Sequence, residues 1–418
     1  MGNNIKGFIV NQRSVLNNMT FITILHIFNL LAPLITYPYL VKVLSKEIYG
    51  IVLTAQVLVS YFSLIINFGF DEVGAKFVSE NRDNPTKLSE IVCSVFFVRF
   101  NLWIVCAVLY LIIVFLIPNY RNHWMLFLCS YGLTFIDVFF PQYFYQGIEK
   151  MKYSTLLNIS IKTLFILLIF VFVNNQSDYV LVPIFYSLGY FIAGILSFLL
   201  IFKKMNIPFS KPKRSTMKSY MKESSALLAT NLIATIKDKL NVLLLGQFSG
   251  MGNVVVYDLG TRVNSLTSKP VEILRISLFP KISREKNIGY VKKILVLSLS
   301  ISIVTAVVVN IFLPQIVQLF LNEKINLWPL RVFSIAPVLL SVSVMIASNV
   351  FIAFGKNKYM LKSIIVTTSA YIFLLLLIWS MGLLSNMYSF IIIAVGSYAI
   401  ELIYRLIIMN KISKEIQK

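Results

Sequence analysis

Long apolar segments alternate with short polar segments along the whole chain. Each apolar segment is close to the roughly 20 residues that a helix needs to cross a bilayer. None alternates at every second residue as barrel strands do, and spanning segments must close their backbone hydrogen bonds internally. The pattern therefore predicts an all-α membrane protein with twelve transmembrane helices at approximately 15–40, 48–69, 89–117, 124–146, 154–173, 179–202, 224–246, 254–279, 291–319, 328–354, 360–380 and 385–409.

The ends of the segments carry ordinary turn signals. Pro118 and Asn119 end the third segment, a polar run at 174–178 follows the fifth, and Gly250 to Asn253 separates the seventh from the eighth. The first segment is too long for a secretory signal and has no small-residue cleavage site. We therefore predict that it is retained as the first helix.

The basic residues of the loops alternate in number from loop to loop. With the N-terminus in the cytoplasm, 25 Lys and Arg residues fall in cytoplasmic loops and termini, against four (Lys42, Lys46, Arg121 and Lys324) in outer loops. Cytoplasmic loops of membrane proteins are enriched in such residues. The distribution predicts twelve spans with the N- and C-termini in the cytoplasm.

The longest basic loop lies in the middle of the chain and divides it into two halves. We predict an N-terminal lobe at 1–202, a basic cytoplasmic linker at 203–223 and a C-terminal lobe at 224–418. The fourth loop contains Gly147 and Lys152-Tyr153, and the tenth contains Gly355 and Lys358-Tyr359, with the Lys-Tyr pairs 206 residues apart. This repetition indicates two six-helix lobes related by a parallel repeat.

Composition supports a membrane location and excludes several classes of function. Hydrophobic residues make up 58% of the chain and charged residues 13%, with a mean hydropathy of +0.80. The net charge of +21 is explained by cytoplasmic loops that contact anionic membrane lipid, and not by nucleic acid, because apolar spans interrupt the basic residues. Single cysteines, the lack of a Walker loop and short outer loops predict no metal site, no cofactor and no catalytic residues. We do not expect an enzyme.

Charged residues inside two predicted helices are the main candidates for function. The seventh helix carries Lys237, Asp238, Lys239 and Asn241, and the eighth carries Asp258, Arg262, Lys269 and Glu272. The spacing places Asp258, Arg262 and Lys269 on one face of the eighth helix. One interpretation is a water-filled cavity for an anionic headgroup, because Arg suits phosphate. The other is an internal network of salt bridges.

The remaining intramembrane polar residues have structural interpretations. Asp137 on the fourth helix and Lys162 on the fifth are expected to pair, and His26 is expected to be a packing residue in preference to a proton relay. Pro270, beside Lys269, is expected to allow the eighth helix to bend. Three arginines are expected to extend from helix ends towards the interface, with Glu401 as a possible partner four residues before the last: Arg275, Arg331 and Arg405.

Several motifs are similar to those of a known family. They are Tyr37–Ser45 with Glu47–Gly50, then Asn67–Phe70, Tyr145–Lys150, Tyr257-Asp258 with Arg262, and Leu278–Arg284. Together they resemble the polysaccharide-transport branch of the multidrug/oligosaccharidyl-lipid/polysaccharide (MOP) exporters, the Wzx-type O-antigen and capsule flippases. The chain departs from the family at Ser45, where Gly is usual. It has Asp71, Glu72 and Lys76 where many relatives have an Arg, so no cytoplasmic-gate role is transferred to this stretch.

The resemblance implies a V-shaped, two-lobed inner-membrane transporter with a central cavity lined by helices one, two, seven and eight. Its cargo would be an undecaprenyl-pyrophosphate-linked oligosaccharide, a unit of O-antigen (lipopolysaccharide) or capsule, moved to the periplasmic leaflet by alternating access. Polysaccharide polymerase machinery is a candidate partner.

In this interpretation Arg262 and Lys237 receive the pyrophosphate, supported by Lys239 and Lys269, and Asn241 serves the sugar. Three acids would line the cavity or couple ions: Asp238, Asp258 and Glu272. The alternatives are a cation-coupled multidrug exporter of the same superfamily and an integral-membrane glycan polymerase or glycosyltransferase, which the short outer loops disfavour.

Overall fold

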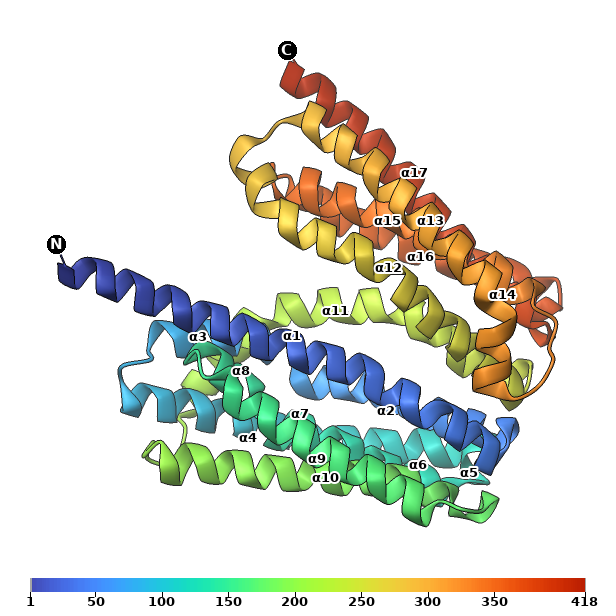
Figure 1. Ribbon diagram of the computed structural model, residues 1–418. Helices are drawn as coiled ribbons and strands as arrows, with labels where there is room; N and C mark the ends of the chain where they lie inside the picture. Colours follow the sequence, from blue (N-terminus) through green and yellow to red (C-terminus); the bar gives the residue numbers. More distant parts are fainter. Residues whose placement is uncertain (1, 418) are drawn as a thin grey trace. The chain divides into compact units, whose positions relative to one another are not determined.

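A computed structural model describes the backbone from Gly2 to Gln417 and the side chains of residues 20–236 and 239–415. Over this backbone the regular elements are all helical and no strand occurs, which confirms the all-α prediction. The chain divides into two compact units, Met1–Leu232 and Ile233–Lys418 (Figure 1). Each unit is described separately.

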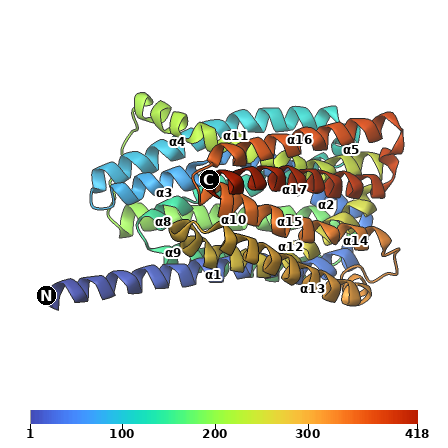
Figure 2. The same cartoon turned by 90° about the horizontal axis from the view of Figure 1, so that it is seen from above.

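The N-terminal unit is a bundle of long helices and shorter pieces. Helix α1 packs on α9, α9 lies beside α10, and α3 lies against α8 (Figures 1 and 2). The helices of this unit are α1 (Gly2–Leu44), α2 (Lys46–Asn67), α3 (Phe70–Glu80), α4 (Pro85–Leu116), α5 (Pro118–Arg121), α6 (Trp124–Tyr131), α7 (Phe135–Phe139), α8 (Gln142–Gly147), α9 (Met151–Phe172) and α10 (Leu181–Leu199).

The C-terminal unit is built around α17, which packs on α15 and α16, while α13 packs on α12 and α15. Helix α11 (Arg214–Phe248) contains the boundary between the two units. The other helices are α12 (Met251–Glu285), α13 (Ile288–Leu321), α14 (Trp328–Phe333), α15 (Ile335–Ile346), α16 (Asn357–Ser380) and α17 (Met387–Gln417).

Among the described residues, ten helical segments are long and apolar enough to cross a membrane. The predicted seventh and eighth spans correspond to α11 and α12, which exist as long helices but carry the polar stripe and are less apolar. The structure thus confirms a multi-helix membrane fold. The count of twelve and the orientation of the termini stay predictions.

Three predicted helices end early or are divided in the structure. The second ends at Asn67, because Phe68 and Gly69 adopt left-handed φ values of 54° and 75°, and the chain then continues as α3. The fourth is divided by a 3₁₀ turn at Gly132–Thr134 and again at Pro141, which lacks the amide hydrogen that a helix needs. The tenth ends in a π-helical turn at Ala347–Ile352. By contrast, α12 runs through Pro270 without interruption.

The two loops that carry the predicted repeat have the same backbone geometry. The Lys150 amide donates to the Tyr145 carbonyl at 2.9 Å, and 206 residues later the Lys356 amide donates to the Phe351 carbonyl at 2.7 Å. The residue before each lysine, Glu149 or Gly355, has a positive φ of 57° or 71°. The repeated sequence therefore encodes a repeated turn.

The segment predicted to link the lobes is packed on α4. The Ser89 hydroxyl donates to the Pro208 carbonyl and to the Ser210 hydroxyl, the latter at 2.8 Å. The Thr216 hydroxyl donates to Glu90 at 2.9 Å. These contacts hold the basic segment against the N-terminal unit.

Candidate functional site

The four charged residues predicted as candidates on α12 form two ion pairs. The Arg262 Nε lies 2.6 Å from the Asp258 carboxylate, and the Lys269 ammonium lies 2.6 Å from Glu272. The first pair is mostly buried, with 26% of the Arg262 and 16% of the Asp258 side chain exposed, whereas the second is nearly half exposed. Both interpretations of the stripe therefore have support. The acids hold the cations in place, and the partial exposure leaves room for a ligand.

A cavity of about 270 Å³ adjoins this stripe within the C-terminal unit. It is lined by α12 and α15, and its polar side chains include Glu272, Arg275 and two serines, Ser268 and Ser341. The Arg275 Nε is buried and has no hydrogen-bond partner among the residues that the structure describes. Sequence reasoning assigned Arg275 to the helix end, but the structure places it in the cavity. The sequence did contain an indication of this position, because residues three apart on a helix, such as Glu272 and Arg275, lie on the same face.

Asn241 is buried and its amide is fully engaged within the C-terminal unit. It donates to the Tyr257 hydroxyl at 2.9 Å and to the Phe390 carbonyl at 3.2 Å, and it accepts from the Tyr371 hydroxyl at 2.6 Å. Its exposed fraction is 0%. In this conformation Asn241 ties α11 to α12, α16 and α17, and it is not placed to contact a sugar.

The other candidates on α11 are only partly described. The side chains of Lys237 and Asp238 lie outside the described residues. Lys239 is half-buried and already has an interaction partner. The predicted roles of these three residues consequently stay predictions.

Two expectations about the N-terminal unit are wrong. Lys162 does not pair with Asp137, because its ammonium donates to the Asn29 side chain at 2.8 Å and lies 5.5 Å from the centre of the Tyr190 ring. Asp137 instead accepts from the Ser63 hydroxyl at 2.5 Å. His26 is exposed, and thus it is not a packing residue of the core.

Arg405 does not extend to the interface as expected, because it is buried with 3% exposure. Its guanidinium lies 2.7 Å from Glu401 and donates to the Ser343 carbonyl and hydroxyl, both at 3.0 Å, and to Ser363 at 3.1 Å. The alternative expectation, a Glu401–Arg405 pair, is confirmed. Arg331 is exposed in the last turn of α14.

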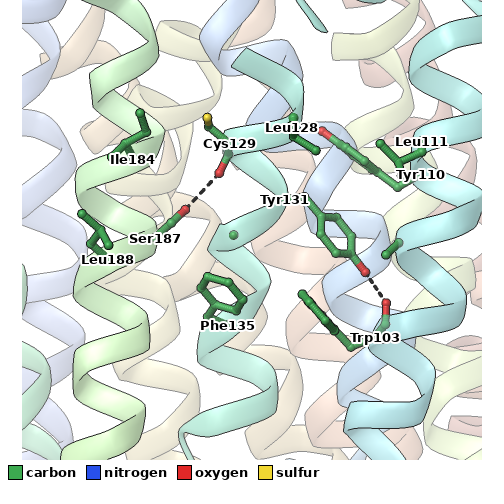
Figure 3. Close-up of a pocket in the computed structure, with 12 residues that line it drawn as sticks. Trp103, Tyr110, Leu111, Leu128, Cys129, Tyr131, Phe135, Ile184, Ser187 and Leu188 are labelled. Atoms are coloured by element: carbon green, nitrogen blue, oxygen red, sulfur yellow. Dashed lines mark hydrogen bonds between the residues drawn. The ribbon is translucent and has the colours of Figure 1, made fainter. Parts of the chain in front are cut away.

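A groove of about 440 Å³ in the N-terminal unit is lined by α4, α6 and α10 (Figure 3). Its polar atoms bond to the protein itself, since the Tyr131 hydroxyl donates to the Trp103 carbonyl at 2.6 Å and Ser187 donates to the Cys129 carbonyl at 3.1 Å. The Tyr110 hydroxyl likewise donates to Phe127 at 2.9 Å. The groove is therefore apolar and unsuited to a charged headgroup.

Comparison with protein families matches residues 15–286 to the family described as "Polysaccharide biosynthesis protein". The match covers more than half of the chain. The chain belongs to this family. The matched range contains all of the N-terminal unit beyond residue 14 and the charged helices α11 and α12.

Curated relatives in the family are named as transporters. The chain is 23% identical over 368 residues to a protein named "Putative O-antigen transporter" in Escherichia coli (strain K12), covering 85% of this chain and 88% of that protein. A protein of the same name in Shigella dysenteriae is 22% identical over 346 residues, covering 82% and 87%. These findings support the resemblance to Wzx-type flippases and a multi-pass location in the bacterial inner membrane.

Solved structures show the same fold at low sequence identity. The lipid II flippase MurJ in an inward closed conformation has a TM-score of 0.73 with 13% identity, covering 94% of this chain and 87% of that one. An inward-facing MATE-family transporter of the MOP superfamily has a TM-score of 0.64 with 13% identity, covering 92% and 99%. This chain therefore shares its fold with these two proteins, and the curated relatives are named as transporters.

Proposed function

We propose that this family member flips an undecaprenyl-pyrophosphate-linked oligosaccharide from the cytoplasmic to the periplasmic leaflet by alternating access. In the proposal the chain has twelve spans with both termini in the cytoplasm, and the lobes 1–202 and 224–418 are joined by the segment 203–223. Support comes from the family match, the transporter names of the curated relatives and the similarity to a lipid II flippase. The observation that carries the proposal is the cationic side of α12.

The α12 cations suit a pyrophosphate because they are held by acids without being fully covered. Arg262 keeps about a quarter of its side chain exposed while Asp258 fixes its Nε. A guanidinium fixed in this way loses little side-chain entropy when it binds an anion, and its planar fork matches phosphate oxygens. Lys269 and Arg275 add positive charge farther along α12, around the cavity that contains Glu272.

In this arrangement Asp258 and Glu272 position the cations. Lys237 and Lys239 on α11 are proposed as supporting contacts, with Asp238 as a further polar group of the same site. Asn241 is proposed to have an architectural role, because its amide is saturated inside the C-terminal unit. The membrane potential, negative inside, favours outward movement of the phosphate charges by about 2.3 kcal/mol per charge per 100 mV.

Complementation of a strain that lacks the gene tests the proposal. Arg262→Ala is expected to reduce surface polysaccharide at least tenfold, because a hydrogen bond to a charged group contributes about 1.5–3 kcal/mol and 1.4 kcal/mol is a factor of ten. Arg284→Ala is the matched control, since Arg284 lies on the same helix with 81% of its side chain exposed. Equal amounts of both variants in the membrane must be verified by immunoblotting.

Full polysaccharide with Arg262→Ala would show that the site assignment is wrong. A deletion strain with normal surface polysaccharide but reduced drug efflux would replace the proposal with multidrug export. Elongation of glycan by the purified protein would replace it with a polymerase.

A further inference from the structure

Arg99 is a buried cation placed beside two acids in the N-terminal unit. Only 2% of its side chain is exposed, and one guanidinium nitrogen lies 2.9 Å from the Asp71 carboxylate. Another donates to the backbone carbonyl of Asp137 at 2.9 Å. The guanidinium also lies over the rings of Phe70 and Tyr143, with centroid distances of 5.9 Å and 5.3 Å.

The two acids differ in what neutralises them. Asp71 faces Arg99, accepts from Asn67 at 2.6 Å and keeps 45% of its side chain exposed. Asp137 lies within an apolar span, and its carboxylate accepts from the Ser63 hydroxyl at 2.5 Å and from the Asn67 side chain. Arg99 donates to the backbone carbonyl of Asp137 and forms its ion pair with Asp71, so that its single charge acts on both carboxylates.

No other cation of the described region replaces Arg99 at Asp137. Lys162 on α9 is bonded to Asn29 and lies over the Tyr190 ring, and the other titratable groups near Asp137 are Asp71 and Tyr190 on α10. One arginine is thus shared by two carboxylates. With both ionised the cluster carries one uncompensated negative charge inside a membrane helix, which is expensive.

We propose that the Asp137 carboxyl group binds one exchangeable proton and that this proton couples to transport. The bound proton makes the cluster neutral, with the Arg99–Asp71 pair intact. When the proton leaves to water, through the half-exposed side of Asp71, the Asp137 carboxylate is left with a negative charge and competes with Asp71 for Arg99. The cluster then has two arrangements of similar energy, as a switch requires.

The position of Asp71 links this competition to a movable element. Asp71 is in the first turn of α3, directly after the break at Phe68 and Gly69. Gly69 lies so close to α11 that an added Cβ would be 3.0 Å from the Leu227 Cβ and 3.2 Å from the Ser224 carbonyl. A displacement of α3 is therefore transmitted to α11, the helix that leads into the C-terminal unit.

Infrared spectroscopy of the purified full chain in detergent tests proton binding without any cargo. A protonated carboxyl band is expected at neutral pH in the wild type and in Glu72→Gln, an exposed acid on α3 outside the cluster. The band is expected to disappear in Asp137→Asn. Since Asn resembles the protonated acid, Asp137→Asn is also expected to keep the thermal midpoint within about 2 °C, whereas Asp71→Asn lowers it by removing the partner of Arg99.

A wild type without this band, or a band that Asp137→Asn leaves unchanged, would overturn the proposal. A midpoint that depends on Na⁺ and not on pH would assign the site to a metal ion instead. The coupling step rests on the proposed function and has its own test, in which Asp137→Asn in cells is expected to make polysaccharide export insensitive to a protonophore. If Asp137 is protonated but the protein exports no polysaccharide, the proposed function is refuted while the assignment of the proton site is retained. If polysaccharide export by Asp137→Asn remained fully sensitive to the protonophore, only the coupling of the proton to transport would be refuted.

Discussion

The Glu401–Arg405 pair of α17 allows a quantitative prediction about the C-terminal unit. Both side chains are almost inaccessible, with 5% and 4% exposed, and they are 2.7 Å apart. Glu401→Gln keeps the size of the side chain and one acceptor but leaves the guanidinium charge buried without a counter-ion. Loss of one partner of a buried ion pair costs about 3–5 kcal/mol. Because the serine contacts of Arg405 remain, we expect a loss of about 3 kcal/mol.

A second ion pair on the same helix provides the control. Glu415 lies 3.3 Å from Lys356, with 45% and 40% of the two side chains exposed. Exposed pairs contribute about 0–1 kcal/mol, so Glu415→Gln should be nearly neutral. The double variant Glu401→Leu with Arg405→Met should be more stable than Glu401→Gln, because it removes the buried guanidinium charge together with the carboxylate that neutralises it.

Reversible denaturant unfolding in detergent, analysed by linear extrapolation, measures these differences. Equal free energies of unfolding for Glu401→Gln and Glu415→Gln would refute the reasoning, because burial would then make no difference to the value of the pair. A double variant less stable than Glu401→Gln would also contradict it.

Two further predictions concern backbone strain and a buried amide. Ser45 has φ 69° and ψ 162°, a region nearly restricted to glycine, so Ser45→Gly should raise the free energy of unfolding by about 1 kcal/mol. A decrease would mean that the hydrogen bond from the Ile48 amide to the Ser45 hydroxyl, at 3.5 Å, contributes more than the backbone strain costs. Asn241→Leu should lower it by about 2–3 kcal/mol, because Tyr371 and Tyr257 lose their buried partner, and a loss below 0.5 kcal/mol in the same unfolding assay would contradict an architectural role.

The helices were predicted well from the sequence in the long apolar segments. Long apolar runs have to be helical, and the repeated Lys-Tyr loops have the same turn in both halves of the chain. The interruptions were less predictable. Phe68 adopts a left-handed conformation that few bulky residues tolerate. Gly132–Thr134 forms a 3₁₀ turn at a point where a Cβ on Gly132 would lie 2.7 Å from Ser187.

The candidate site was predictable only where its residues share a helix. Spacing placed Asp258, Arg262 and Lys269 on one face of α12, and the structure pairs Arg262 with Asp258 and Lys269 with Glu272. Contacts between helices were not accessible in this way. Arg99 and Asp71 lie on different helices, and nothing in their spacing indicates that they meet. Asn241 is a polar residue of the kind that contacts ligands, but its side-chain oxygen accepts a hydrogen bond from Tyr371, which is 130 residues away in the sequence.

The transport claim can be tested most directly with the purified protein in proteoliposomes. A polyprenyl-pyrophosphate-linked oligosaccharide is placed in both leaflets, and the fraction accessible to an added glycosidase or lectin is followed over time. With wild-type protein that fraction should rise from about half to nearly all of the lipid, and Arg262→Ala should slow the rise at least tenfold relative to Arg284→Ala. A fraction that stays at the level of protein-free liposomes, with correctly folded wild-type protein present, would contradict the account.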